Sequence, residues 1–119
     1  MAAAACLALA LALAGCGSGG SGSGASSHLL SAAPLKPAEL AAGRAIFRDR
    51  CARCHTLADV GAHGTRGPNL DQIRLPAFAV WQQIKLGGGG MPAYAGRLSD
   101  EQIRQVAGYV VARRAVGAG

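Results

Sequence analysis

Two cysteines and a histidine are the residues of this sequence whose types and spacing could do chemistry. The stretch "RCARCHTL", from Arg50 to Leu57, holds Cys51 and Cys54, with His55 directly after the second cysteine. A CxxC pair can serve as a redox dithiol, as half of a zinc site, as a structural disulfide or as the attachment point of a c-type haem. The rest of the sequence has to decide between these four kinds of site.

Three of the four leave part of the pattern unexplained. A thioredoxin-like dithiol needs a strand–helix–strand context, whereas this sequence predicts helices. A structural zinc ion needs four ligands, and Cys51, Cys54 and His55 supply three at most. His63 could add a fourth, but no second CxxC and no HxxxH motif appears. A disulfide is possible in an exported protein but gives His55 no role. The CxxCH pattern of c-type haem uses all three residues.

A single methionine could complete such a haem site. Apart from the initiator, Met91 is the only methionine, and it lies in the loop sequence "GGGGMPAY" at 87–94. Iron held by His and Met is the cytochrome c arrangement, which raises the reduction potential. A lone methionine is usually core filler. Here, however, four glycines precede Met91 and Pro92 follows it, so the backbone can approach a flat cofactor closely and then stiffen.

Three segments are predicted to be helices that position these residues. Residues 37–50 begin with Pro37, which suits a first helical turn, and carry Leu40, Gly43 and Phe47 on one face. A glycine on that face permits close approach by another helix.

The clearest helix lies at 99–114. Ser99 as N-cap with Gln102 three residues later forms a capping box, and Leu98 with Ile103 forms a hydrophobic staple.

A third helix is expected at 76–86 and is expected to end at Gly87. No strand is predicted. Phe78, Trp81 and Ile84 are expected to point inward from the third helix, and the remaining residues to form two loops, 57–75 and 87–97.

The N-terminal residues predict export and a lipid anchor. The apolar run at 2–14 is shorter than the roughly 20 residues that span a bilayer, so it indicates a secretory signal. It ends in "LAGC", which resembles the lipobox of bacterial lipoproteins, with cleavage before Cys16 and lipid attached to that cysteine. The expected organisation is a lipoprotein-type signal peptide at 1–15, the lipid-attachment cysteine and a flexible Gly/Ser tether at 16–36, and a folded domain at 37–116.

The charge is basic, at +6 from 12 Lys+Arg against 6 Asp+Glu. The basic residues are scattered singly, with only Arg113 and Arg114 adjacent, and no nucleic-acid motif is present. We therefore expect no nucleic-acid partner. The basic residues predict either a simply solvated surface or one that steers toward acidic partners or anionic lipid.

Five stretches in order resemble class I monohaem cytochromes c over residues 38–114. The resemblance implies an all-α fold, a small cytochrome c fold with three to four helices wrapped around one covalently bound haem c. An early CxxCH also argues against the four-helix c′ type. The stretches are "GRAIF" (43–47), "CARCH" (51–55), "GPNL" (67–70), "MPAY" (91–94) and "LSDEQIRQVAGYV" (98–110).

The resemblance also implies residue roles. Cys51 and Cys54 would carry the thioether bonds, and His55 and Met91 would bind iron. The Pro68 carbonyl would accept a hydrogen bond from the other ring nitrogen of His55. Gly43 and Phe47 would meet the C-terminal helix near Tyr109, and Trp81 or an arginine would donate to a haem propionate.

The expected function is single-electron transfer by an exported, lipid-anchored, monomeric carrier that is not an enzyme. The expected partners are a respiratory oxidase, a quinol-oxidising complex or a periplasmic dehydrogenase, met through small, transient contacts. Two alternatives stay open. One is a small haem enzyme or ligand sensor with an open iron site, which requires Met91 to be absent from the iron or displaced. The other is a haem-free thiol module.

Overall fold

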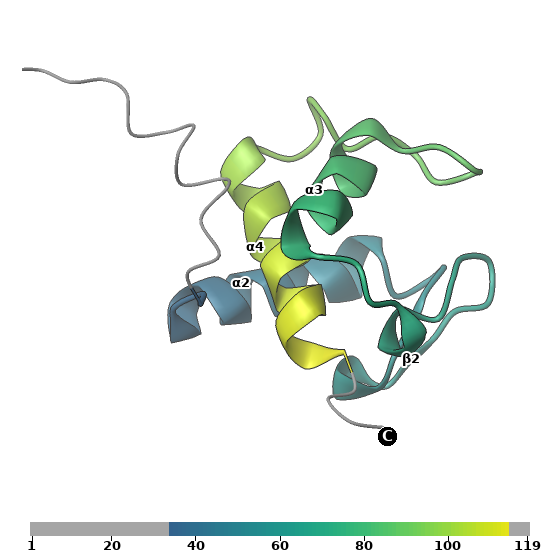
Figure 1. The fold of residues 1–119 in the computed structure, drawn as a ribbon, viewed down its shortest axis with the longest axis horizontal. Helices are drawn as coiled ribbons and strands as arrows, with labels where there is room; N and C mark the ends of the chain where they lie inside the picture. Colours follow the sequence, from purple (N-terminus) through teal and green to yellow (C-terminus); the bar gives the residue numbers. More distant parts are fainter. Residues whose placement is uncertain (1–33, 115–119) are drawn as a thin grey trace, which may run out of the picture.

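The computed structural model describes residues 34–114, which form three α-helices and two 3-10 turns (Figure 1). The predicted signal peptide, Cys16 and nearly all of the tether lie outside these residues. No helix within them combines the length and the apolar character that crossing a bilayer requires. The helical elements are α2 (Pro37–Arg50), η1 (Ala58–Val60), η2 (Leu70–Gln72), α3 (Ala77–Leu86) and α4 (Asp100–Arg113).

The expectation that the chain contains no strand was wrong. Two short strands, β1 (Thr56–Leu57) and β2 (Ala62–His63), pair antiparallel directly after the CxxCH sequence. Gly61 has a φ of 63°, which lets the chain turn back after η1. The described residues therefore form three helices and a small two-stranded sheet. The predicted helices are present, but the prediction of an all-α fold holds only in part.

Helix α4 packs on α2 at a glycine, as the sequence predicted. A Cβ on Gly43 would lie 2.7 Å from Tyr109 Cβ and 2.9 Å from the Gln105 carbonyl carbon, so only glycine fits this crossing. One turn later, the rings of Phe47 and Tyr109 pack at 6.2 Å between centroids. The close approach buries Phe47 completely.

The start of α4 is also as predicted. The Gln102 backbone N–H donates to Ser99 Oγ at 3.1 Å, and the Ser99 backbone N–H donates to Gln102 Oε1 at 2.9 Å. These reciprocal bonds satisfy donors that the first turn of a helix leaves free. Lys85 pairs with Asp100 at 2.8 Å and so links the end of α3 to this capped turn.

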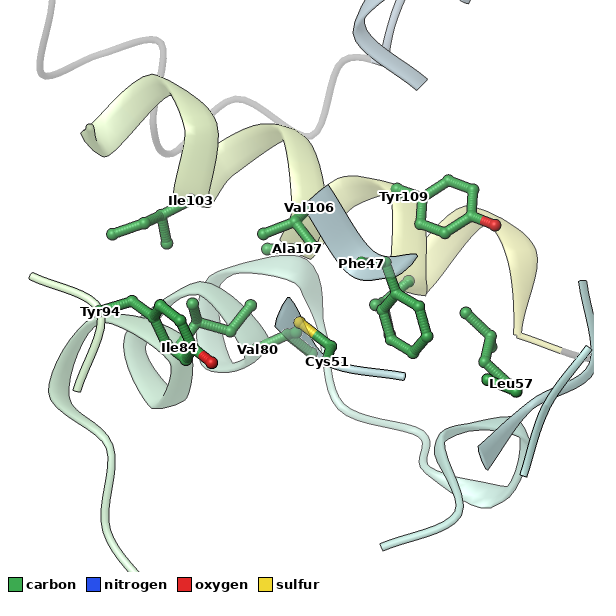
Figure 2. Packing of buried hydrophobic residues seen from close by; sticks show 12 residues of the cluster. Phe47, Cys51, Leu57, Val80, Ile84, Tyr94, Ile103, Val106, Ala107 and Tyr109 are labelled. Carbon is green, nitrogen blue, oxygen red and sulfur yellow. The ribbon is translucent and has the colours of Figure 1, made fainter. Parts of the chain in front are cut away.

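Helix α3 turns a different face to the core from the one predicted. Ile84 is buried as expected, but its inward partner is Val80, one turn earlier, whereas Phe78 is 47% exposed and Trp81 is only partly buried. Figure 2 shows Val80 and Ile84 facing the α4 side chains Val106 and Ile103. Phe78 and Trp81 stack on each other at 5.8 Å on the neighbouring flank of the helix.

We expect Gly43→Ala to lower the free energy of unfolding by about 1–3 kcal/mol, the usual cost of overpacking. The loss of stability should remain although alanine favours the helix by about 1 kcal/mol relative to glycine. The matched control is Gly108→Ala in α4, where the new Cβ would meet only the flexible Leu35 side chain. Chemical denaturation should leave the control at wild-type stability or above it. Equal stability of the two variants would contradict a close helix crossing at Gly43.

Candidate functional site

The CxxCH residues form a turn at the end of α2. The backbone N–H groups of Cys54 and His55 both donate to the Cys51 carbonyl, at 3.0 Å each. Cys51 is buried in the apolar cluster, where Figure 2 shows it beside Val80, while Cys54 is partly exposed, and both thiols are free. Burial raises the pKa of the Cys51 thiol to about 12, with smaller contributions from Cys54 and Asp49. The turn thus presents two unbridged thiols and a histidine.

The His55 ring is oriented by a carbonyl oxygen. His55 is buried, and its Nδ1 lies 2.9 Å from the Pro68 oxygen, the contact that the "GPNL" stretch implied. A carbonyl can only accept, so Nδ1 carries the hydrogen of this bond. In the neutral ring, the lone pair is then on Nε2. The geometry therefore supplies one metal-binding nitrogen with a fixed tautomer.

Two glycines, for which no role was predicted, let the following loop pass close to this histidine. A Cβ on Gly67 would lie 2.7 Å from His55 Nδ1, and one on Gly64 would lie 2.5 Å from the His55 backbone nitrogen. Both glycines also donate backbone hydrogen bonds to the turn, Gly67 to the Cys54 carbonyl at 2.7 Å and Gly64 to the His55 carbonyl at 3.2 Å. The sequence signals were the presence of Gly64 shortly after the motif and of Gly67 at the start of the "GPNL" stretch.

Met91 follows a tight glycine turn. The Gly88 N–H donates to the Met91 carbonyl at 2.9 Å, and the Met91 N–H donates to the Gly88 carbonyl at 3.1 Å. Gly89 and Gly90, between them, have φ values of 61° and 87°, which two-residue hairpin turns of this kind require. The Met91 side chain is partly buried against the core, with its sulfur 4.0 Å from Gln83 Nε2.

Trp81 contributes a buried donor. Its indole Nε1 is buried and has no acceptor among residues 34–114. The Lys85 ammonium lies 4.7 Å from the Trp81 ring centroid and restrains the ring. A buried N–H without a partner costs about 1–3 kcal/mol, so this position suits an acceptor supplied by a bound group.

The described residues do not form a zinc site. In the part of the chain that the structure describes, no three His, Cys, Asp or Glu side chains come together to hold a metal ion. His63, considered as a fourth ligand, is exposed on β2. A c-type haem instead uses the groups found here: two free thiols, an imidazole nitrogen, a thioether sulfur and a buried indole donor. These residues fit that group.

Comparisons with known proteins find several similar sequences. Residues 38–110 match the family model described as cytochrome C oxidase, cbb3-type, subunit III. Cytochrome c6 from Parathermosynechococcus lividus is 40% identical over 84 residues, which cover 67% of this chain and 97% of the relative. Cytochrome c6 from Leptolyngbya boryana is 39% identical over 80 residues, covering 62% and 92%.

A solved structure is similar as well. The crystal structure of the c-type cytochrome SorU from Sinorhizobium meliloti shares 43% identity with this chain, at a TM-score of 0.62. The match covers 66% of this chain and 94% of that one.

We expect Gly67→Ala to displace the His55 ring and to break or lengthen its hydrogen bond to Pro68, because the added Cβ would occupy space next to Nδ1. The matched control is Gly61→Ala, where a side chain meets nothing within 4 Å but is strained by the φ of 63°. Both variants should lose about 1–3 kcal/mol of stability. Only Gly67→Ala should shift the ¹⁵N resonances of the His55 ring. Unchanged ring resonances in Gly67→Ala would contradict the close packing.

Proposed function

The chain belongs to the class I c-type cytochromes, and on this premise we propose that His55 and Met91 are the two axial ligands of its haem iron. The protein is an electron carrier rather than an enzyme, with one haem c attached covalently through Cys51 and Cys54. When bound, the haem supplies one-electron exchange. The chain's own residues hold and orient the haem and surround it with apolar side chains.

The observation that carries this proposal is the hydrogen bond between His55 Nδ1 and the Pro68 carbonyl. It leaves Nε2 as the nitrogen with a lone pair, and it increases the electron density on the ring. Packing of Gly67 against the ring supports the same orientation. We assign Met91 as the second ligand because a hairpin turn of positive-φ glycines holds its backbone and because its side chain is partly buried against the core. A thioether ligand would raise the reduction potential of a His-ligated haem.

Trp81 is proposed to donate its indole N–H to a haem propionate. Its Nε1 is buried without an acceptor in the described part of the chain, and a carboxylate would satisfy it with a charge-assisted bond. Phe78, which stacks on Trp81, and Leu75 are both about half exposed and would cover the same apolar cofactor.

We also propose that the domain is exported and attached to a bacterial membrane through lipid on Cys16. The support is the "LAGC" sequence that closes the apolar run and the Gly/Ser-rich residues after it. A tether of about 20 residues would have a reach of roughly 25 Å and would raise the effective concentration of the domain near membrane redox complexes. The proposed partners are a respiratory oxidase, a quinol-oxidising complex or a periplasmic dehydrogenase, met by a monomer.

Two arginines beside the CxxCH turn suit contact with acidic partners. Arg53 lies between the two cysteines and Arg66 directly precedes Gly67. Both are exposed, and within residues 34–114 neither has a carboxylate partner. Unpaired surface charges of one sign speed the diffusional encounter with a partner of the other sign.

We expect Met91→Ala to change the ligation of the iron without loss of the haem. The ferric protein should lose the weak long-wavelength absorption band of methionine–iron bonding, the ferrous protein should bind carbon monoxide, and the reduction potential should fall. Leu98→Ala, another truncation of a partly buried side chain, is the control and should keep the band. The measurement is an optical spectrum with a redox titration.

The optical spectrum and a haem assay of the wild-type protein decide between the electron carrier and the two alternative functions. Wild-type protein that already lacks the band and binds carbon monoxide readily would favour an open-site haem enzyme or sensor. A pyridine haemochrome assay without a signal, on protein made with the haem-attachment machinery, would favour the thiol module.

The charge proposal predicts a salt-dependent rate. Electron transfer to a purified acidic redox protein should slow about tenfold or more from low to high ionic strength, since steering of this kind raises on-rates 10- to 1,000-fold. The double variant Arg53→Gln with Arg66→Gln should reduce both the rate and its salt dependence. The control is Arg113→Gln, which also removes a positive charge from an arginine but lies beside α2 residues at the end of α4. It should change the rate and its salt dependence less. A rate that does not depend on salt would remove the steering claim.

A further inference from the structure

Tyr94 lies three residues after Met91 and is tied to a distant part of the chain. Its side chain is 8% exposed, and its hydroxyl donates to the Arg50 carbonyl at 3.1 Å, across 44 residues of sequence. Arg50 is the last residue of α2 and directly precedes Cys51. Figure 2 shows the Tyr94 ring beside Ile84, within the same cluster as Cys51. One hydroxyl therefore connects the methionine loop to the segment that carries the cysteines.

The Arg50 carbonyl is free to accept because the CxxCH turn interrupts the helix. In a continuing α-helix the Cys54 N–H would donate to this oxygen. Here the Cys54 N–H donates to the Cys51 carbonyl instead. A half-buried carbonyl without a donor is costly, and the Tyr94 hydroxyl supplies the donor. Burial raises the pKa of Tyr94, so the hydroxyl keeps its proton.

The backbone of Tyr94 is held as firmly as its side chain. Its N–H donates to the Ile84 carbonyl in α3 at 3.0 Å. Its carbonyl accepts from the N–H groups of Arg97 and Leu98, which lead into α4, at 2.9 and 3.0 Å. Tyr94 thus joins the end of α2, the end of α3 and the approach to α4. The Met91 hairpin directly precedes this junction in the chain.

From this geometry we propose that Tyr94 is a positioning residue, which holds the Met91 loop against the haem-attachment turn and so limits how readily Met91 leaves the iron. The inference rests on the proposed ligation by Met91 and goes beyond it. In this proposal, displacement of the methionine carries residues 88–91 outward, and the Tyr94–Arg50 bond resists that movement. The hydroxyl is the part of Tyr94 that makes this bond, whereas the ring contributes packing in the core.

The experiment compares Tyr94→Phe with Tyr109→Phe in the haem-loaded protein. Both variants remove one hydroxyl from a buried tyrosine and keep the ring. The Tyr109 hydroxyl, however, bonds to Asp59 in η1, and Tyr109 lies toward the end of α4 that is far from the capped first turn. The readout is the apparent affinity of imidazole for the ferric protein, followed by loss of the methionine–iron band. Thermal unfolding is measured in parallel.

We expect Tyr94→Phe to bind imidazole about three- to tenfold more tightly than wild type, the effect of losing one hydrogen bond. Tyr109→Phe should stay within about twofold, whatever its loss of thermal stability. Equal effects in the two variants, or none in Tyr94→Phe, would overturn the positioning role while leaving the ligand assignment intact. A wild-type protein without the methionine–iron band would overturn both.

Discussion

The crossing of α2 and α4 at Gly43 is the constraint on which the rest of the structure depends. The missing side chain allows the helices to come so close that Phe47 packs on Tyr109 and is wholly buried. Phe47 in turn accepts, through its carbonyl, the backbone hydrogen bonds of Cys51 and Ala52. The place and direction in which α2 ends, and hence the place of the CxxCH turn, follow from this one contact. In a folded part of about 80 residues few other contacts could take over that role.

The loops after the CxxCH turn and before Met91 approach the site through backbone contacts rather than through side chains. The peptide groups of Gly64 and Gly67 pack against the turn and the His55 ring, and the glycines before Met91 form a hairpin whose positive φ angles most residues with a side chain disfavour. The result is a histidine whose ring is packed on one face and hydrogen-bonded at Nδ1. Small residues in these loops are thus as much a part of the site as the cysteines and the histidine.

The sequence was sufficient for the features that depend on local patterns. Helices α2 and α4 carry their own start signals and an apolar face, and the His55–Pro68 contact was implied by an ordered motif. The face of α3 could not be predicted, because an aromatic pair and a Val80–Ile84 pair compete for the same core and tertiary packing selects between them. The short β1–β2 pairing depends on a single glycine turn. The Tyr94–Arg50 bond joins a side chain to a carbonyl far away in sequence, and such a contact leaves no local pattern.

The two proposed iron ligands are held in unequal ways. His55 lies within the turn that carries both cysteines, and its ring is fixed by Pro68 and by close packing of Gly67. Met91 stands at the end of a glycine hairpin whose cross-strand bonds are internal to residues 88–91, so those bonds can move together with the methionine. Resistance to that movement comes from outside the hairpin, and Tyr94 is where the loop is joined to the end of α2, to α3 and to the segment that leads into α4. With the proposed ligation, the methionine side is therefore where an exogenous ligand would enter, and we propose that Tyr94 rather than the hairpin opposes its entry.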